Sequence, residues 1–228
     1  MNRSLTNIVF ALVVLAMPIF LVLTVAHVGA RWYLPHEYGK PDFPPDPYGF
    51  TQAQRLELAQ VSLDYLLDPN PPDVAIETLR ALRLPSTEQS LFDKYELGHM
   101  LDVKRFIDVL RKIQLLTGIL VVGGLIYLLA RAGTRRTGYD ALLFGGGLAA
   151  ALLLGLAGFV LLSWTQSFIF FHELFFPPGT WTFDWSSSLI RLFPDKFWFD
   201  GGATLMVGSL ILGLLIALTG WVLKKRAA

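Results

Sequence analysis

The 228-residue sequence contains no cysteine. Disulfides, thiolate nucleophiles, Cys-based zinc sites and lipidation of the chain itself are therefore excluded, and an exported region would have to be held together by packing alone. Charge is also scarce, at 16% of residues against roughly 25% in typical soluble domains. The net charge of +1 gives no reason to expect a nucleic-acid partner. The sequence patterns of nucleophile elbows, zinc proteases, phosphate loops and dinucleotide-binding folds are missing as well.

Long apolar runs are what the sequence has instead. Hydrophobic residues make up 54% of the chain, and the mean hydropathy is +0.51. A membrane-spanning helix needs about 20 apolar residues. Four stretches free of Asp, Glu, Lys and Arg meet this requirement: residues 8–28, 113–130, 141–164 and 203–223. The sequence therefore predicts an all-α integral membrane protein with four transmembrane helices and a helical extracytoplasmic cap.

Two residue types modify these spans. Pro18 interrupts the first and is expected to kink it, which membrane helices tolerate. Glycines recur in the other three and are expected to let helices approach closely.

The distribution of charge predicts the orientation. The short segments on one side carry seven basic residues against Asp140 alone: Arg3, Arg131, Arg135, Arg136, Lys224, Lys225 and Arg226. Residues 30–112 instead carry ten basic and thirteen acidic side chains, and residues 165–202 carry two and four. Because basic loops stay in the cytoplasm, both termini are predicted there, and the cap is predicted outside or in the periplasm.

The chain is accordingly divided into eight segments. They are a first transmembrane helix (1–29), the extracytoplasmic cap (30–112), a second helix (113–131), a cytoplasmic loop (132–140), a third helix (141–164), an aromatic outer segment (165–202), a fourth helix (203–223) and a cytoplasmic tail (224–228). A cleavable signal peptide is the alternative for the first helix, because Arg3 precedes an apolar run that ends in small residues. We favour an uncleaved helix, since the run is longer than a usual signal core.

Within the cap, a Pro-rich coil is expected from Pro35 to Pro47. Thr51 and Gln54 form a capping-box pattern, which predicts a helix to about Leu67. A shorter helix is expected over residues 73–82. Residues 91–112 are amphipathic and are predicted to run straight into the second span. No strand is predicted.

Histidines are the first candidates for chemistry, because their side chains exchange protons near neutral pH. His99 shares a helix face with Tyr95, Asp102 and Phe106, so Asp102 could fix its tautomer and prepare it as a base. The alternative is a surface histidine beside an acid. His27 and His36 lack an evident partner and are interpreted as structural.

His172 lies among five phenylalanines just past a predicted span, where desolvation favours the neutral imidazole. Residues 164–199 hold thirteen of the thirty aromatic residues of the chain. This concentration indicates either a loop in the headgroup region or an apolar chamber for acyl chains with polar groups at its mouth.

Several motifs resemble one known family. They are His99-Met100-x-Asp102-Val103-Lys104, Phe171-His172-x-x-Phe175-Phe176, Trp181-x-Phe183-Asp184, Leu189-Ile190 and Pro194-x-x-Phe197-Trp198. Together with the four spans and one large cap, they resemble the bacterial lipoprotein intramolecular transacylase (Lit) family over essentially the whole chain. Pro177-Pro178-Gly179 departs from the more polar stretch expected there.

The resemblance implies a reaction and a site. The reaction moves the sn-2 acyl chain of a lipoprotein's diacylglyceryl-cysteine onto the α-amino group of that cysteine, which leaves a lyso-form lipoprotein. His99 and His172 are implied as the catalytic pair, with His99 favoured as the base. The candidate substrate contacts are Tyr95, Asp102, Phe171, Phe175, Phe176, Trp181, Asp184, Trp185 and Arg191.

The implied partners are a diacylglyceryl lipoprotein and membrane lipid, with no cofactor or metal and the site on the extracytoplasmic face. Three alternatives stay open: another His-dependent membrane acyl hydrolase or transferase, a non-enzymatic membrane scaffold or assembly factor, and a haem or metal site. The last is disfavoured because two histidines without cysteine are a thin ligand set.

Overall fold

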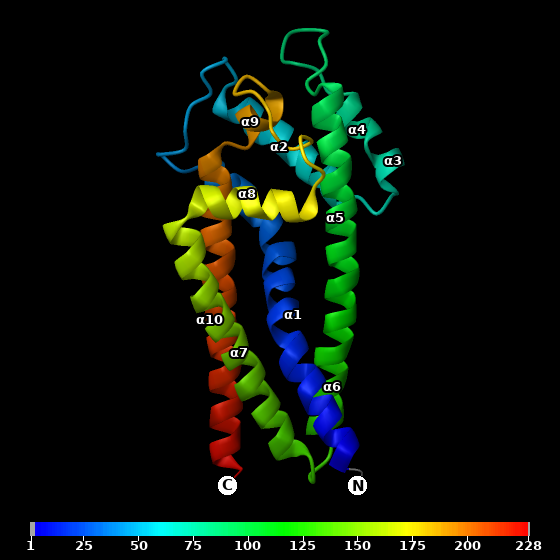
Figure 1. Cartoon of the computed structure of the whole chain (residues 1–228), viewed down its shortest axis with the longest axis vertical. Helices are drawn as coiled ribbons and strands as arrows, with labels where there is room; N and C mark the ends of the chain where they lie inside the picture. The colour runs from blue at the N-terminus through cyan, green and yellow to red at the C-terminus, as the bar shows by residue number, and fades with distance from the viewer. Residues whose placement is uncertain (1–2, 228) are drawn as a thin grey trace. The chain divides into compact units, whose positions relative to one another are not determined.

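The computed structural model describes residues 3–227 and is helical (Figure 1). Four helices are long and apolar enough to cross a membrane: Arg3–Tyr38, Lys94–Leu129, Arg135–Val160 and Asp195–Arg226. They contain the first and fourth predicted spans and all but the last residues of the second and third. Among the described residues, the only strand-like pairing is an isolated bridge between Arg83 and Ser90.

The second long helix is continuous with the cap, as predicted. It consists of α5 (Lys94–Gly118), a five-residue π-helical turn η1 (Ile119–Gly123) and α6 (Gly124–Leu129). The other three are α1 (Arg3–Tyr38), α7 (Arg135–Leu162) and α10 (Asp195–Arg226). The chain divides into two compact units, formed by residues 1–27, 110–162 and 203–228 and by residues 28–109 and 163–202. We call them the span unit and the cap unit.

Close backbone packing characterises the span unit. Its core includes Val13, Met17 and Leu128, all essentially inaccessible. A Cβ atom added at Gly146 on α7 would lie 2.5 Å from the carbonyl oxygen of Gly213 on α10. The expectation that glycines permit close helix approach is therefore confirmed, and α7 and α10 touch backbone to backbone.

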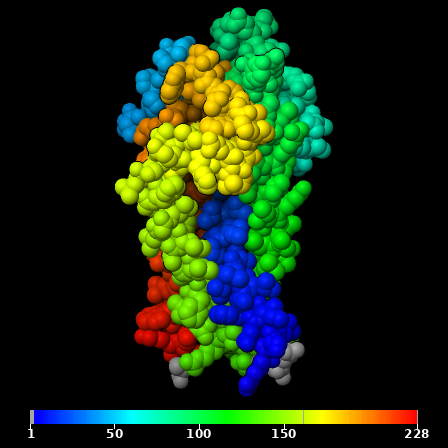
Figure 2. Space-filling view, in the orientation of Figure 1, coloured from blue at the N-terminus to red at the C-terminus, as the bar shows by residue number. Residues whose placement is uncertain are grey.

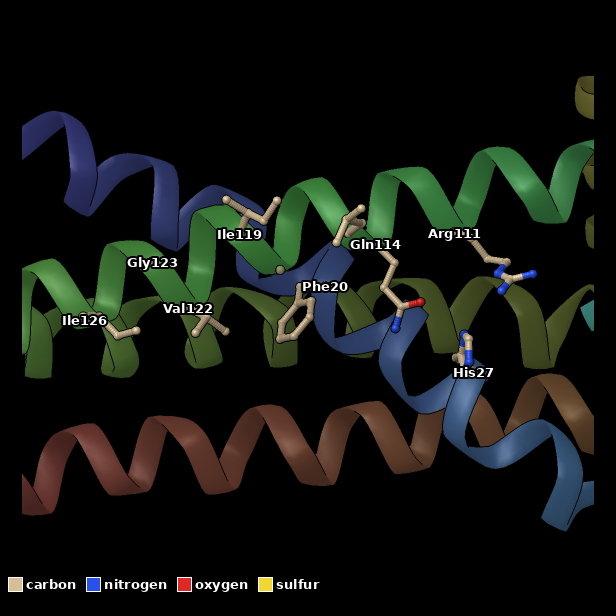
Figure 3. A pocket seen from close by; sticks show the side chains of 10 residues that line it. Phe20, His27, Arg111, Gln114, Ile119, Val122, Gly123 and Ile126 are labelled. Atoms are coloured by element: carbon tan, nitrogen blue, oxygen red, sulfur yellow. The ribbon is translucent and has the colours of Figure 1, made fainter. Parts of the chain in front are cut away.

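A groove of about 640 Å³ lies along α1, α5 and η1 in the span unit (Figure 3). Its walls are largely apolar, whereas His27, Arg111 and Gln114 line one end. Gln114 Nε2 donates to Thr24 Oγ1 at 3.4 Å across the two helices.

The cap unit is built from α2 (Gln52–Leu67), α3 (Pro72–Ala75), α4 (Glu77–Arg80), α8 (Trp164–Phe175) and α9 (Ser188–Leu192), together with the cap-side ends of α1, α5 and α10. The predicted capping box is present at Thr51, and α2 ends at Leu67 as expected. The buried core beneath these helices includes Tyr65, Leu79, Leu91 and Leu192.

Three predicted boundaries are wrong. Pro35 lies inside α1 and not in coil, because Leu34 and Tyr38 are buried in the cap core and hold the last turn helical. The single helix expected over residues 73–82 is two four-residue helices. The third long helix stops at Leu162, because Ser163 has a non-helical backbone (φ −141°, ψ 50°) and Trp164 opens α8.

Candidate active site

Two histidine rings face each other inside the cap unit. His99 lies on α5 and His172 on α8, with ring centroids 6.2 Å apart and planes inclined by 27°. Helix α8, coloured yellow, lies against α5, coloured green, in Figures 1 and 2. The sequence predicted both residues as functional, and the fold brings them together.

Buried polar contacts hold α5 in place around His99. Glu96 is buried, and its carboxylate accepts from the backbone N–H of Asp93 at 2.8 Å and of Leu189 at 2.9 Å. One turn beyond His99, the inaccessible Lys104 donates to the carbonyl oxygen of Asp68 at 2.9 Å and to Asp108 at 2.6 Å. Buried charged groups are costly unless paired in this way, so these contacts fix the register of α5.

Aromatic contacts position α8 at both of its ends. Near its start, Trp164 packs edge-on against Phe199 of α10 at 5.3 Å. Near its end, Phe175 lies 4.7 Å and Phe171 lies 5.9 Å from Phe106 on α5, measured between ring centroids. The aromatic residues that the sequence concentrates here thus connect α8 to its neighbours.

The tautomer of His172 follows from its backbone contact. Its Nδ1 atom lies 2.7 Å from the carbonyl oxygen of Phe168, one turn earlier on α8. A carbonyl oxygen only accepts, so Nδ1 carries the proton and Nε2 presents a lone pair. Burial lowers the pKa of His172, and the carbonyl contact opposes this in part. His172 is therefore a neutral base at neutral pH.

His99 is more deeply buried and differently partnered. Its ring contacts Phe176 at 5.1 Å and Phe183 at 5.6 Å. Burial, with a smaller contribution from His172, lowers the pKa of His99 to about 4. Its Nδ1 atom is buried and has no hydrogen-bond partner among the described residues.

The predicted pairing of Asp102 with a ring nitrogen of His99 is wrong. Asp102 Oδ1 instead accepts from Arg105 at 3.3 Å. Both His99 and Arg105 lie three residues from Asp102 on α5, and the cationic neighbour at the exposed edge binds the carboxylate in place of the neutral ring.

The structure brings some of the other candidates to the histidine pair. Phe176 is buried, with its ring 5.1 Å from that of His99 and 5.5 Å from that of His172. The ring of Trp181 lies 5.0 Å from His172. Phe171 and Phe175 are partly exposed on the outer side of the same cluster.

Other candidates are engaged elsewhere. Tyr95 is 68% exposed with Lys94 over its ring, and Trp185 is 74% exposed. Asp184 is exposed as well. Arg191 is held by Asp46 at 2.9 Å and covers the ring of Phe50, so it fastens α9 to the loop before α2.

Sequence reasoning gave no role to Phe168 or Phe183, although both contact the pair. The i, i+4 spacing of Phe168 and His172 on one helix was the available signal for the first. Phe183 belongs to the Trp181-x-Phe183-Asp184 motif but was not predicted as a candidate contact. Within residues 3–227, no group of three or more His, Cys, Asp or Glu side chains is arranged to hold a metal ion.

Comparison with known proteins identifies the family. Residues 6–198 match the family described as "Lipoprotein intramolecular transacylase Lit". The chain belongs to this family. An uncharacterised protein of Aquifex aeolicus (strain VF5) is 30% identical over 193 residues, which cover 85% of this chain and 83% of that protein.

Solved structures agree in fold. The membrane-integral Lit of Bacillus cereus superposes with a TM-score of 0.78 at 23% identity, over 99% of both chains. A second structure of that protein, with one histidine replaced by alanine, superposes with a TM-score of 0.71, over 98% of this chain and 96% of that one. The chain is thus a multi-pass integral membrane protein of an acyltransferase family, and its family implies a lipoprotein substrate.

Proposed function

We propose that this Lit family member moves the sn-2 acyl chain of a diacylglyceryl-cysteine onto the α-amino group of the same cysteine. The carrying observation is the histidine pair, in which His172 has a fixed tautomer with Nε2 free to accept a proton. No cysteine is present, and the reaction needs none, because the amine attacks the ester directly.

The proton transfers that the reaction requires indicate which histidine is the base. The α-amino nitrogen forms a C–N bond with the ester carbonyl carbon and must lose a proton. The C–O bond to the sn-2 oxygen then breaks, and that oxygen must gain a proton, since an alkoxide is a poor leaving group. His172 Nε2 takes the first proton and delivers it to the departing oxygen, as a single imidazole does in acyl transfer. This reverses the sequence-based preference for His99 as the base.

His99 has a different role in this proposal. With a pKa of about 4 it carries no proton to donate as an imidazolium at neutral pH. Its buried, unpartnered Nδ1 suits an acceptor that holds one N–H of the attacking amine. Nucleophile and ester belong to one molecule, so holding them in the reactive geometry supplies much of the rate enhancement.

The aromatic cluster beside the pair supports a site for acyl chains. Phe171, Phe175 and Phe176 all contact the ring of Phe106, and Phe171 and Phe176 also contact His172. Burying each acyl methylene against such rings is favourable by about 0.8 kcal/mol. We place this site on the outer face of a bacterial plasma membrane, on the basis of the charge distribution.

Tandem mass spectrometry of a lipoprotein N-terminus tests the reaction, because the fragment ions show whether the acyl chain is on the nitrogen or on the glyceryl oxygen. A synthetic diacylglyceryl-cysteinyl peptide incubated with the full-length protein should yield the N-acyl lyso-form of unchanged mass. His172→Asn should slow this conversion by about 10²–10⁴-fold, the usual contribution of a general base.

The matched control is His36→Asn, because His36 is exposed and stacks on Trp32. It should retain the wild-type rate. Release of free fatty acid in place of the N-acyl product would show a hydrolase. Full conversion by His172→Asn would contradict the assigned base.

A further inference from the structure

Trp181 carries a polar atom that the fold leaves without a partner. Its indole Nε1 is buried and has no hydrogen bond among the described residues. The indole ring packs on His172, with centroids 5.0 Å apart and planes inclined by 36°. A buried donor therefore lies beside the proposed base.

A tight turn brings Trp181 to this place. The backbone N–H and the hydroxyl of Thr180 both donate to the carbonyl oxygen of Pro177, at 3.2 and 2.9 Å. Gly179 has φ +78°, which fits the third position of a type II turn, with Pro178 before it. The Pro-Pro-Gly segment thus reverses the chain after α8, and Trp181, two residues after Gly179, packs on His172.

The indole N–H of Trp181 lacks a hydrogen-bond acceptor among the described residues. More than about 90% of buried polar groups are hydrogen-bonded, and leaving one unsatisfied costs about 1–3 kcal/mol. Indole nitrogen only donates, so it can act neither as base nor as nucleophile. An acceptor atom of a molecule bound next to His172 would satisfy this N–H.

We infer that the Trp181 Nε1–H donates a hydrogen bond to the ester carbonyl oxygen and stabilises the oxyanion that forms on it. The inference rests on the proposed acyl transfer. When the amine attacks, the C=O π electrons move to this oxygen, and they return when the bond to the sn-2 oxygen breaks. His172 takes the proton from the amine and delivers it to the departing sn-2 oxygen. The indole N–H therefore keeps its own proton throughout.

A donor of this kind acts mainly in the transition state. Removing one oxyanion donor typically lowers kcat by about 10²–10³-fold. Removing an N–H that bound the ground state and the transition state equally would instead raise KM with kcat unchanged. The split between kcat and KM is therefore diagnostic of the role.

Two replacements separate the N–H from the shape of the ring. Trp181→Phe keeps an aromatic ring, and a 3-benzothienylalanine residue at position 181 keeps the indole shape with sulfur in place of N–H. Both should lower kcat on the diacylglyceryl-cysteinyl peptide by about 10²–10³-fold with little change in KM. Trp32→Phe is the matched control, because Trp32 is 56% exposed and lies outside the proposed site, so it should tolerate the change.

Thermal unfolding of each full-length variant in detergent completes the test. Because the Trp181 N–H has no partner among the described residues, the variant with the benzothienyl residue should unfold at the wild-type temperature or above. A lowered unfolding temperature would show a structural hydrogen bond and overturn the inference, as would a wild-type kcat. If the wild-type protein itself forms no N-acyl product, the proposed function fails; if it does and the benzothienyl variant matches it, only the role of Trp181 fails.

Discussion

At the scale of single residues, the two histidines differ in the hydrogen-bond partner of Nδ1. His172 has its Nδ1 proton fixed by the carbonyl oxygen of Phe168, whereas His99 Nδ1 has no partner within residues 3–227. Burial lowers the pKa of both rings below 6.5. Both imidazoles are therefore mainly neutral at pH 7, where the α-ammonium group of the substrate is still mainly protonated.

The pH dependence of kcat/KM should consequently report the substrate. An α-ammonium group has a pKa of about 7.7–8.0, so the reactive amine is lost below that pH. We expect kcat/KM to fall about tenfold for each pH unit from 7 to 6, measured by mass spectrometry of the N-acyl product. A plateau from pH 8 to 6 would contradict this reasoning.

A modified substrate distinguishes amine from enzyme. Oxidising the thioether of the diacylglyceryl-cysteine to a sulfone withdraws electrons and lowers the pKa of the adjacent amine. The acid limb should move to lower pH with this substrate, whereas a limb set by a histidine would stay in place.

At the scale of secondary-structure elements, the packing of α7 on α10 depends on two glycines. A Cβ at Gly146 would approach the carbonyl oxygen of Gly213 to 2.5 Å and the backbone nitrogen of Ala217 to 2.7 Å. At Gly220, a Cβ would come within 2.5 Å of the nitrogen of Leu143. Backbone atoms cannot rotate aside as a flexible side chain can, so the two helices would have to separate.

Gly146→Ala should therefore destabilise the protein by about 1–3 kcal/mol, the usual cost of overpacking. Gly147→Ala is the matched control, since no atom outside the local helix lies within 4 Å of its added Cβ. The unfolding temperature in detergent should fall for the first variant and stay or rise for the second, because alanine favours helix. Equal unfolding temperatures would contradict the close packing of α7 on α10.

Local sequence signals predicted the elements better than the site. Apolar run length gave the four spans, and the Thr51–Gln54 capping box gave the first residue of α2. The contact between His99 and His172 joins α5 to α8, and no periodicity encodes such a long-range contact. The resemblance to a family predicted this pair, whereas helical spacing alone selected Asp102, which Arg105 binds instead.

The end of the third span is another feature that local sequence signals do not predict. Its apolar run continues past Leu162, so composition extends the helix to Trp164. The break at Ser163 is a change of backbone direction, and Trp164 then packs on Phe199. A tertiary contact thus ends the helix where hydropathy does not change.

At the scale of the whole molecule, the charge distribution predicts the side of the membrane on which each loop lies. The loop between α6 and α7 contains Arg131, followed by Arg135 and Arg136 at the start of α7. The cap is instead mildly acidic. The positive-inside rule predicts that the basic loop is cytoplasmic and that the cap, with both histidines, lies on the outer face, as in the proposed function.

The absence of native cysteine makes this orientation directly testable, because a single introduced thiol has no background. Glu88→Cys in the cap and Ala132→Cys in the basic loop both change exposed residues. In intact cells, a membrane-impermeant maleimide should label Glu88→Cys and leave Ala132→Cys unlabelled until the membrane is permeabilised. The reverse pattern would place the cap in the cytoplasm. An outer cap would put the histidine pair on the side where exported lipoproteins display their acylated N-termini.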